Sequence, residues 1–98
     1  MFKNLGEGFG PRMLIEAARH QATEFPWLPA ALSKCGEGEW ESRAYVRYVP
    51  CHQPNQPGSE WQFETNVVLH LPELGMVVLD VLQGQRIGGI ELVDRIEG

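Results

Sequence analysis

Two kinds of hydrophobic periodicity divide the chain into a helical first third and a strand-like remainder. Pro11 suits the first turn of a helix, where its missing N–H would have no partner, and Pro26 ends the apolar pattern that follows. The spacing therefore predicts a helix over residues 11–25. Its core-facing side is formed by Leu14, Ala17, Ala18, Gln21, Ala22 and Phe25. A short second helix is expected over residues 29–34.

Strict alternation of polar and apolar residues predicts four strands in the rest of the chain. They cover residues 40–49, 60–71, 75–83 and 86–96. Gly84 lies between the last two, where a tight turn requires a positive φ. The Pro72 turn controls the register of the second and third strands, and a shift of one residue there would exchange the faces of the last hairpin.

These elements predict a single α+β domain over residues 1–98, in which the helices pack on a four-stranded antiparallel meander. Residues 1–10 are expected to form a flexible lead, and residues 50–59 a long Pro-rich loop. The amphipathic helix and the half-apolar sheet must bury each other. The predicted core therefore packs strand residues against the helix residues Leu14, Ala18 and Phe25; the strand residues are Trp61, Phe63, Val67, Leu69, Leu79 and Ile90.

Composition narrows the range of partners. The chain has 98 residues and a formal net charge of −5, from 8 basic and 13 acidic residues. This balance argues against a general nucleic-acid binder, which needs Lys and Arg to displace counterions from phosphates. No apolar stretch approaches the ~20 residues of a membrane span, and no signal peptide is visible. We therefore expect a cytoplasmic protein in which Cys35 and Cys51 are free thiols.

Motifs that carry chemistry are weak in this sequence. Gly6, Gly8 and Gly10 precede a helix but follow no strand, so they do not match the dinucleotide-binding pattern. The histidines and cysteines lack the paired spacing of structural zinc sites. Cys51 and His52 are adjacent, which does not by itself place a base against a nucleophile. We therefore expect no metal and no cofactor.

The polar face of the predicted sheet is the first candidate site. It is the face opposite the helices, and alternation gives it a set of candidate binding residues: Arg43, Tyr45, Arg47, His70, Asp80 and Glu91, with Glu64 and Asn66 beside them. His70 near Asp80 or Glu91 would permit acid–base chemistry. The alternative is a solvated face whose charges form cross-strand ion pairs.

An apolar patch on the same face is the second candidate. Its predicted interface residues are Val78, Leu82, Ile87 and Val93, next to Met76. Such a patch often marks a protein interface. It favours association with a second copy, as a homodimer, or with another protein. The alternative is that the short second helix covers the patch.

The closing segment, residues 76–96, is similar to the final hairpin of several small bacterial families without an assigned role. The resemblance implies a bacterial domain and carries over no functional residue. The sequence as a whole favours a non-enzymatic interaction module, such as a self-associating domain, an accessory subunit or an acidic immunity-type partner of a basic protein. A small enzyme or ligand-binding domain that uses the polar sheet face is the alternative.

Overall fold

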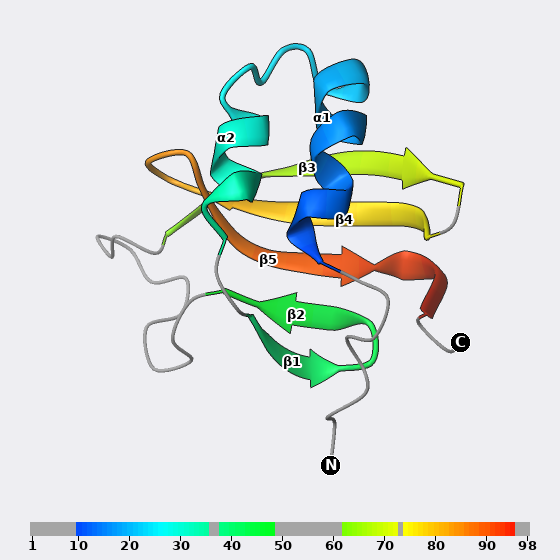
Figure 1. The fold of residues 1–98 in the computed structure, drawn as a ribbon. Helices are drawn as coiled ribbons and strands as arrows, with labels where there is room; N and C mark the ends of the chain where they lie inside the picture. Colours follow the sequence, from blue (N-terminus) through cyan, green and yellow to red (C-terminus); the bar gives the residue numbers. More distant parts are fainter. Residues whose placement is uncertain (1–9, 36–37, 49–61, 73, 96–98) are drawn as a thin grey trace.

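A computed structural model describes residues 10–35, 38–48, 62–72 and 74–95 of the chain. They form an α+β fold in which two helices pack on one five-stranded antiparallel sheet (Figure 1). This confirms the predicted class and both helices. The predicted loop 50–59 and the lead 1–10, apart from Gly10, lie outside the described residues, as do Trp61, Cys51 and His52.

The helical segment begins with a 3-10 turn, Pro11–Leu14, and continues as α1, Ile15–Gln21. It ends earlier than the predicted residue 25 because Ala22 leaves the helical region, with φ −124° and ψ 55°. The second helix, α2, spans Leu28–Ser33 and has a proline in its first turn, as the pattern indicated. No described helix is long and apolar enough to cross a membrane.

The strands are β1 (Glu39–Ser42), β2 (Tyr45–Arg47), β3 (Phe63–Leu71), β4 (Gly75–Leu82) and β5 (Arg86–Leu92), followed by a 3-10 turn, Val93–Arg95. Their order in the sheet is β1-β2-β5-β4-β3. Only β3, β4 and β5 form the predicted meander. The strand before them pairs with β5 instead of β3, which is the Greek-key arrangement.

The predicted single strand over residues 40–49 is a hairpin. The chain reverses at Arg43 and Ala44, where the Ala44 amide donates to the Ser42 hydroxyl oxygen at 3.1 Å. Trp40 pairs with Val46, so both side chains lie on the same face of the sheet, as the alternation predicted. The alternation of residues 40–49 persists through this turn, which is why the pattern did not reveal it.

The core lies between the helices and one face of the sheet, here called the inner face. Val67, Leu69, Leu79 and Ile90 are buried in it, as predicted, and they pack with Leu14, Ala18 and other buried residues. Phe25 is partly buried against the same cluster. The prediction was wrong for Phe63, which is 36 % exposed. The pairing with β4 is irregular between Phe63 and Thr65, and this places Phe63 opposite Leu82 on the other face.

A second irregularity corrects the predicted apolar patch. On β5, Asp80 pairs with Gly89 but the next residue, Val81, pairs with Ile87, so Gly88 is an extra residue. Such a bulge reverses the alternation beyond it. Ile87 therefore joins Ile90 in the core, 6 % exposed, and is not an interface residue on the outer side.

The two turns of the meander rest on positive φ angles. Gly84 has φ +86° between Gln83 and Gln85, as expected for the β4–β5 turn. At the Pro72 turn, Leu71 pairs with Gly75, whose φ is +76°. This register puts Val77 and Leu79 on the inner face beside Leu69 and Val67, so the predicted face holds for these two residues of β4.

Candidate functional site on the outer sheet face

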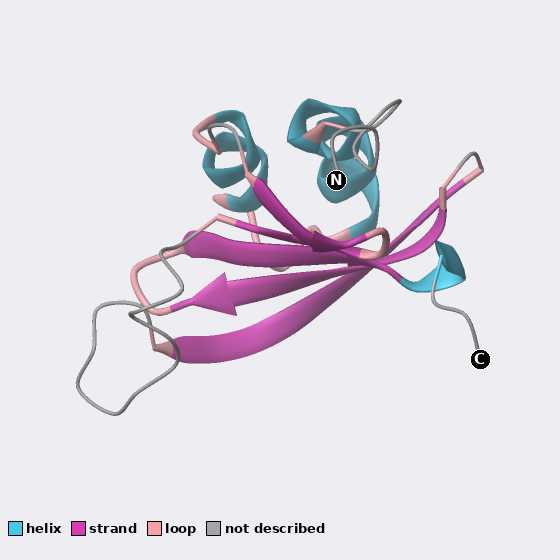
Figure 2. Cartoon of the chain, turned by 90° about the horizontal axis from the view of Figure 1, so that it is seen from below, coloured by secondary structure: helices cyan, strands magenta, loops and turns pink. Residues whose placement is uncertain are grey.

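Both helices cover the same face of the sheet, and Figure 2 shows them together on that side. Leu28 and Leu32 of α2 belong to the same core cluster as Leu14 and Ala18. The alternative in which the second helix covers the opposite side is therefore wrong. We call that opposite side the outer face. Its described residues on the paired strands include Tyr45, Arg47, Phe63, Asn66, Val68, His70, Met76, Val78, Asp80, Leu82, Gly89 and Glu91.

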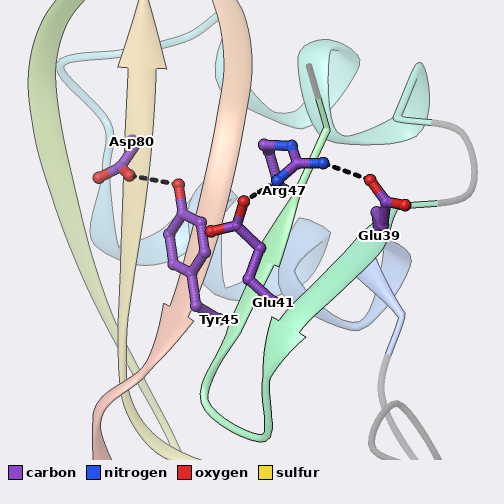
Figure 3. A network of polar contacts seen from close by, with 5 residues as sticks. All are labelled: Glu39, Glu41, Tyr45, Arg47 and Asp80. Carbon is purple, nitrogen blue, oxygen red and sulfur yellow. Dashed lines mark hydrogen bonds and ion pairs between the residues drawn. The ribbon is translucent and has the colours of Figure 1, made fainter. Parts of the chain in front are cut away.

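A polar network crosses the middle of the outer face. The Tyr45 hydroxyl on β2 donates to Asp80 Oδ2 on β4 at 2.8 Å (Figure 3). The other carboxylate oxygen of Asp80 accepts a hydrogen bond from Asn66 Nδ2 on β3 at 2.7 Å. Asp80 is thus held from both sides, and the network ties together strands that are not adjacent in the sheet. Hydrogen bonds to a charged acceptor are stronger than those between neutral groups.

Gly89 allows the Tyr45 side chain to reach Asp80 across β5. It lies on β5, between the strands that carry Tyr45 and Asp80. A Cβ atom at this position would overlap the ring and the hydroxyl oxygen of Tyr45. The tyrosine therefore crosses β5 only because position 89 carries no side chain.

Arg47 organises the neighbouring part of the face. Its guanidinium forms ion pairs with Glu39 and with Glu41, both from β1 (Figure 3). The Arg47 side chain is only 14 % exposed, whereas Glu39 is 75 % exposed. Because one arginine faces two carboxylates, the net charge of this part of the outer face is negative.

The environment of Tyr45 favours its neutral form. Burial raises the pKa of this phenol well above its ordinary value of 10.0, and the hydrogen bond to Asp80 and the charges of Asp80 and Glu91 raise the pKa further. A phenol with a raised pKa is a poor general base near neutral pH. The Tyr45 hydroxyl is therefore a hydrogen-bond donor that fixes Asp80.

This raised pKa leads to a prediction about alkaline stability. Because the hydroxyl ionises more readily in the unfolded chain, its contribution is fully present below pH 10 and is lost as the pH rises toward the folded pKa. We expect Tyr45→Phe to be about 1 kcal/mol less stable than wild type at neutral pH, since Tyr45 is half-buried. The gap should narrow above pH 10. Urea unfolding at about pH 7 and about pH 11 measures the difference in free energy of unfolding between Tyr45→Phe and wild type. A difference that is the same at both pH values would contradict the role of the Tyr45 hydroxyl as a donor to Asp80.

The structure brings together four of the six predicted binding residues. Tyr45 pairs with Glu91, and Arg47 lies in the same row across the strands as Asp80, with Gly89 between them. Arg43 lies in the β1–β2 turn.

His70 stands apart from the acids that were considered as its partners. It pairs with Met76 at the far end of β3, whereas Asn66, four residues earlier on the strand, is the residue opposite Asp80. Four residues of strand correspond to roughly 13 Å. The register therefore does not bring His70 against Asp80.

The apolar part of the face differs from the predicted patch. Val78 is half-buried on the outer face, Leu82 is buried, and Val93 is half-buried in the 3-10 turn after β5. The exposed apolar residues are instead Val68, Met76 and Phe63, of which Val68 is 46 % exposed. Val68 pairs with Val78, so the two form one apolar row beside the Asn66–Asp80 pair.

Three contributors were missed in the sequence analysis. Glu41 lies in the alternating segment but was not among the candidate residues, although it forms an ion pair with Arg47. Glu39 precedes the alternating segment, and Gly89 has no side chain to reveal a role. Each becomes visible only when its cross-strand neighbour is known. Glu39 pairs with Arg47, and Gly89 lies beneath Tyr45.

Metal-binding and thiol chemistry were also considered. Among the described residues, no group of three or more His, Cys, Asp or Glu side chains is placed to hold a metal ion. Cys35 is a free thiol, and its Sγ lies 3.6 Å from the Ala31 carbonyl oxygen. Burial raises the pKa of the Cys35 thiol from 9.0 to about 11. It is therefore a weak nucleophile at neutral pH.

Comparison of the chain with protein-family models, with curated proteins and with solved structures finds no match.

Proposed function

We propose that this domain is a non-enzymatic protein-interaction module that binds a partner protein through its outer sheet face. The observation that carries the proposal is the placement of both described helices on the inner face, which leaves Val68, Met76 and Phe63 exposed on or beside the other. Exposed apolar side chains grouped near a rigid polar centre are typical of interfaces.

The polar network supports binding more than catalysis. The carboxylate of Asp80 is held by Tyr45 and Asn66, and the guanidinium of Arg47 is paired with two glutamates. Among the described residues, no buried side-chain nitrogen or oxygen lacks a hydrogen-bond partner. These groups therefore fix the shape of the face, and a rigid surface loses less conformational entropy on binding.

The charge of the face indicates the chemistry of the partner. On β3, β4 and β5 the acidic residues are Glu64, Asp80 and Glu91, against one arginine, Arg86, which pairs with Leu82. On the neighbouring strands Glu39 and Glu41 more than balance Arg47. A partner that presents Lys and Arg around an apolar centre complements this distribution. We therefore propose a basic protein surface as the partner.

The proposal is tested by photo-crosslinking from two methionine positions. Met76 on β4 and Met13 in the first 3-10 turn are each 37 % exposed, so they offer a matched pair on different sides of the molecule. A photoreactive amino acid at position 76, introduced in cells that naturally express the protein, should crosslink to a partner through a Lys- or Arg-rich peptide. Position 13 should not. Identical products from both positions, or none from position 76, would refute the proposal.

Affinity for the purified partner then tests the charge argument. We expect Glu91→Gln to weaken binding by about three- to tenfold, with a reduced dependence on salt. Glu24→Gln removes the same charge from an exposed residue between the two helices and serves as the control. Equal affinities of the two variants would argue against recognition by the outer face.

A further inference from the structure

The two edges of the sheet differ in how they are protected against pairing with a further strand. At one edge, β1 has four residues, an irregular register between Trp40 and Ser42, and two glutamates. Short, bulged and charged edge strands resist such pairing. At the other edge, β3 has nine residues, contains no Lys or Pro, and pairs regularly with β4 from Thr65 to Leu71. The strand itself therefore gives this edge little protection.

Gln21, the last residue of α1, binds the β3 edge with its side chain. Its Nε2 donates to the His70 carbonyl oxygen at 2.7 Å, and its Oε1 accepts from the His70 amide at 2.8 Å. A residue of a neighbouring antiparallel strand would make this same pair of bonds. The carboxamide of Gln21 therefore takes the place of one residue of a strand at His70.

The helix holds Gln21 in position for this contact. Gln21 falls on the apolar side of the helical pattern, and the prediction that it faces the core was wrong, because its side chain is exposed at the sheet edge. Ala18 and Ala22, on the same side of the helix, are buried in the core. Since they fix the backbone on both sides of Gln21, only the torsions of its side chain have to be ordered for the contact.

Two side chains cap the outward backbone groups of β3. Because His70 directs its N–H and C=O away from β4, alternation gives Val68 and Asn66 the same orientation. The Asn66 carbonyl oxygen accepts a hydrogen bond from the Thr65 hydroxyl at 3.5 Å. Val68 therefore lies between two capped residues. Over residues 66–70, an incoming strand would not find two successive outward residues with both N–H and C=O available.

We propose that Gln21 is an edge cap that keeps β3 from pairing with a strand of another chain. A strand that displaced the carboxamide at His70 would replace two hydrogen bonds by two others and would gain none there. It would still lose the conformational freedom of each residue that it orders. Without the Gln21 side chain, Val68 and His70 become two successive open residues on a long, regular edge. The cap acts independently of recognition by the outer face.

Sedimentation velocity of the full chain tests the cap. Gln21→Ala should self-associate at a concentration at least about tenfold lower than wild type, because two hydrogen bonds no longer compete with the incoming strand. Glu24→Ala truncates another exposed polar residue close to the end of α1 and should sediment as wild type does.

Substitutions at Val68 distinguish edge pairing from association that is caused by a loss of stability. Val68→Pro removes an outward N–H and leaves the bonds between β3 and β4 in place, as for prolines found on edge strands. Added to Gln21→Ala, it should restore the sedimentation of wild type. Val68→Thr keeps the N–H, so its addition to Gln21→Ala should not. Circular dichroism checks that all variants are folded.

Hydrogen exchange locates the effect on the strand. In dilute solution, Gln21→Ala should raise the exchange rate of the His70 amide by about tenfold, because this amide loses its acceptor. The His70 and Val68 amides should become protected when the variant associates. Unchanged exchange at His70, a Gln21→Ala variant that associates no more than wild type, or a Gln21→Ala/Val68→Pro double variant that still associates would each overturn the proposal.

Discussion

Leu79→Ala should lower the free energy of unfolding by about 2–5 kcal/mol, the largest effect that we expect from one core substitution. Leu79 is 0 % exposed at the centre of β4, paired with Val67 on one side and Ile90 on the other. Truncation removes its own burial and leaves a cavity between the sheet and the helices that the neighbouring strands cannot collapse to fill. For a domain of this size, such a loss is a large part of the total stability.

The control for this substitution lies on the next strand. Val68→Ala removes a smaller side chain that is 46 % exposed on the outer face, and under monomeric conditions it should change stability by about 0.5 kcal/mol or less. Urea unfolding of both variants measures the difference. Equal destabilisation would mean that the inner and outer faces have been assigned incorrectly.

Gly89→Val should cost about 2–4 kcal/mol, although it adds only apolar atoms to a buried position. The new side chain would occupy the space now taken by the Tyr45 ring and hydroxyl. Tyr45 must then leave, and its hydrogen bond to Asp80 breaks. The substitution therefore combines overpacking with the loss of a charge-assisted hydrogen bond.

A double-mutant cycle tests whether the collision with Tyr45 causes the destabilisation by Gly89→Val. In a Tyr45→Ala background the collision is absent, so Gly89→Val should cost at least about 1.5 kcal/mol less than it does in wild type. Tyr45 and Gly89 would then be shown to act together. If the two substitutions are additive, the glycine is required for a reason other than the crossing of Tyr45.

Alternation along the chain predicted the sheet faces well where the strands are regular. Val67, Leu69, Leu79 and Ile90 were assigned to the core from period two alone, and all four are buried. The prediction for Phe63 and Ile87 was wrong because a bulge lies beside each of them. A bulge adds one residue to one strand, and a single sequence read without its partner strand does not show it.

The strand order could not be predicted from periodicity. Residues 40–49 alternate as one long strand would, and the hairpin turn at Arg43 and Ala44 contains no Gly, Pro, Asn or Asp to mark it. Pairing of β2 with β5 is a long-range choice that local pattern does not encode. The candidate site depends on this choice, because only the β2–β5 pairing brings Tyr45 within reach of Asp80.

The same long-range pairing has a kinetic consequence. The turns of the β3–β4–β5 meander join residues close in sequence, whereas Tyr45 must find Glu91, almost half the chain away. Closing the longer loop costs more entropy, so the meander is favoured to form before β1 and β2 dock on it. The Tyr45–Asp80 hydrogen bond closes only when that docking is complete. Until then the outer face lacks Tyr45, Arg47 and their glutamates, so a partner that recognises this face would select chains that have finished folding.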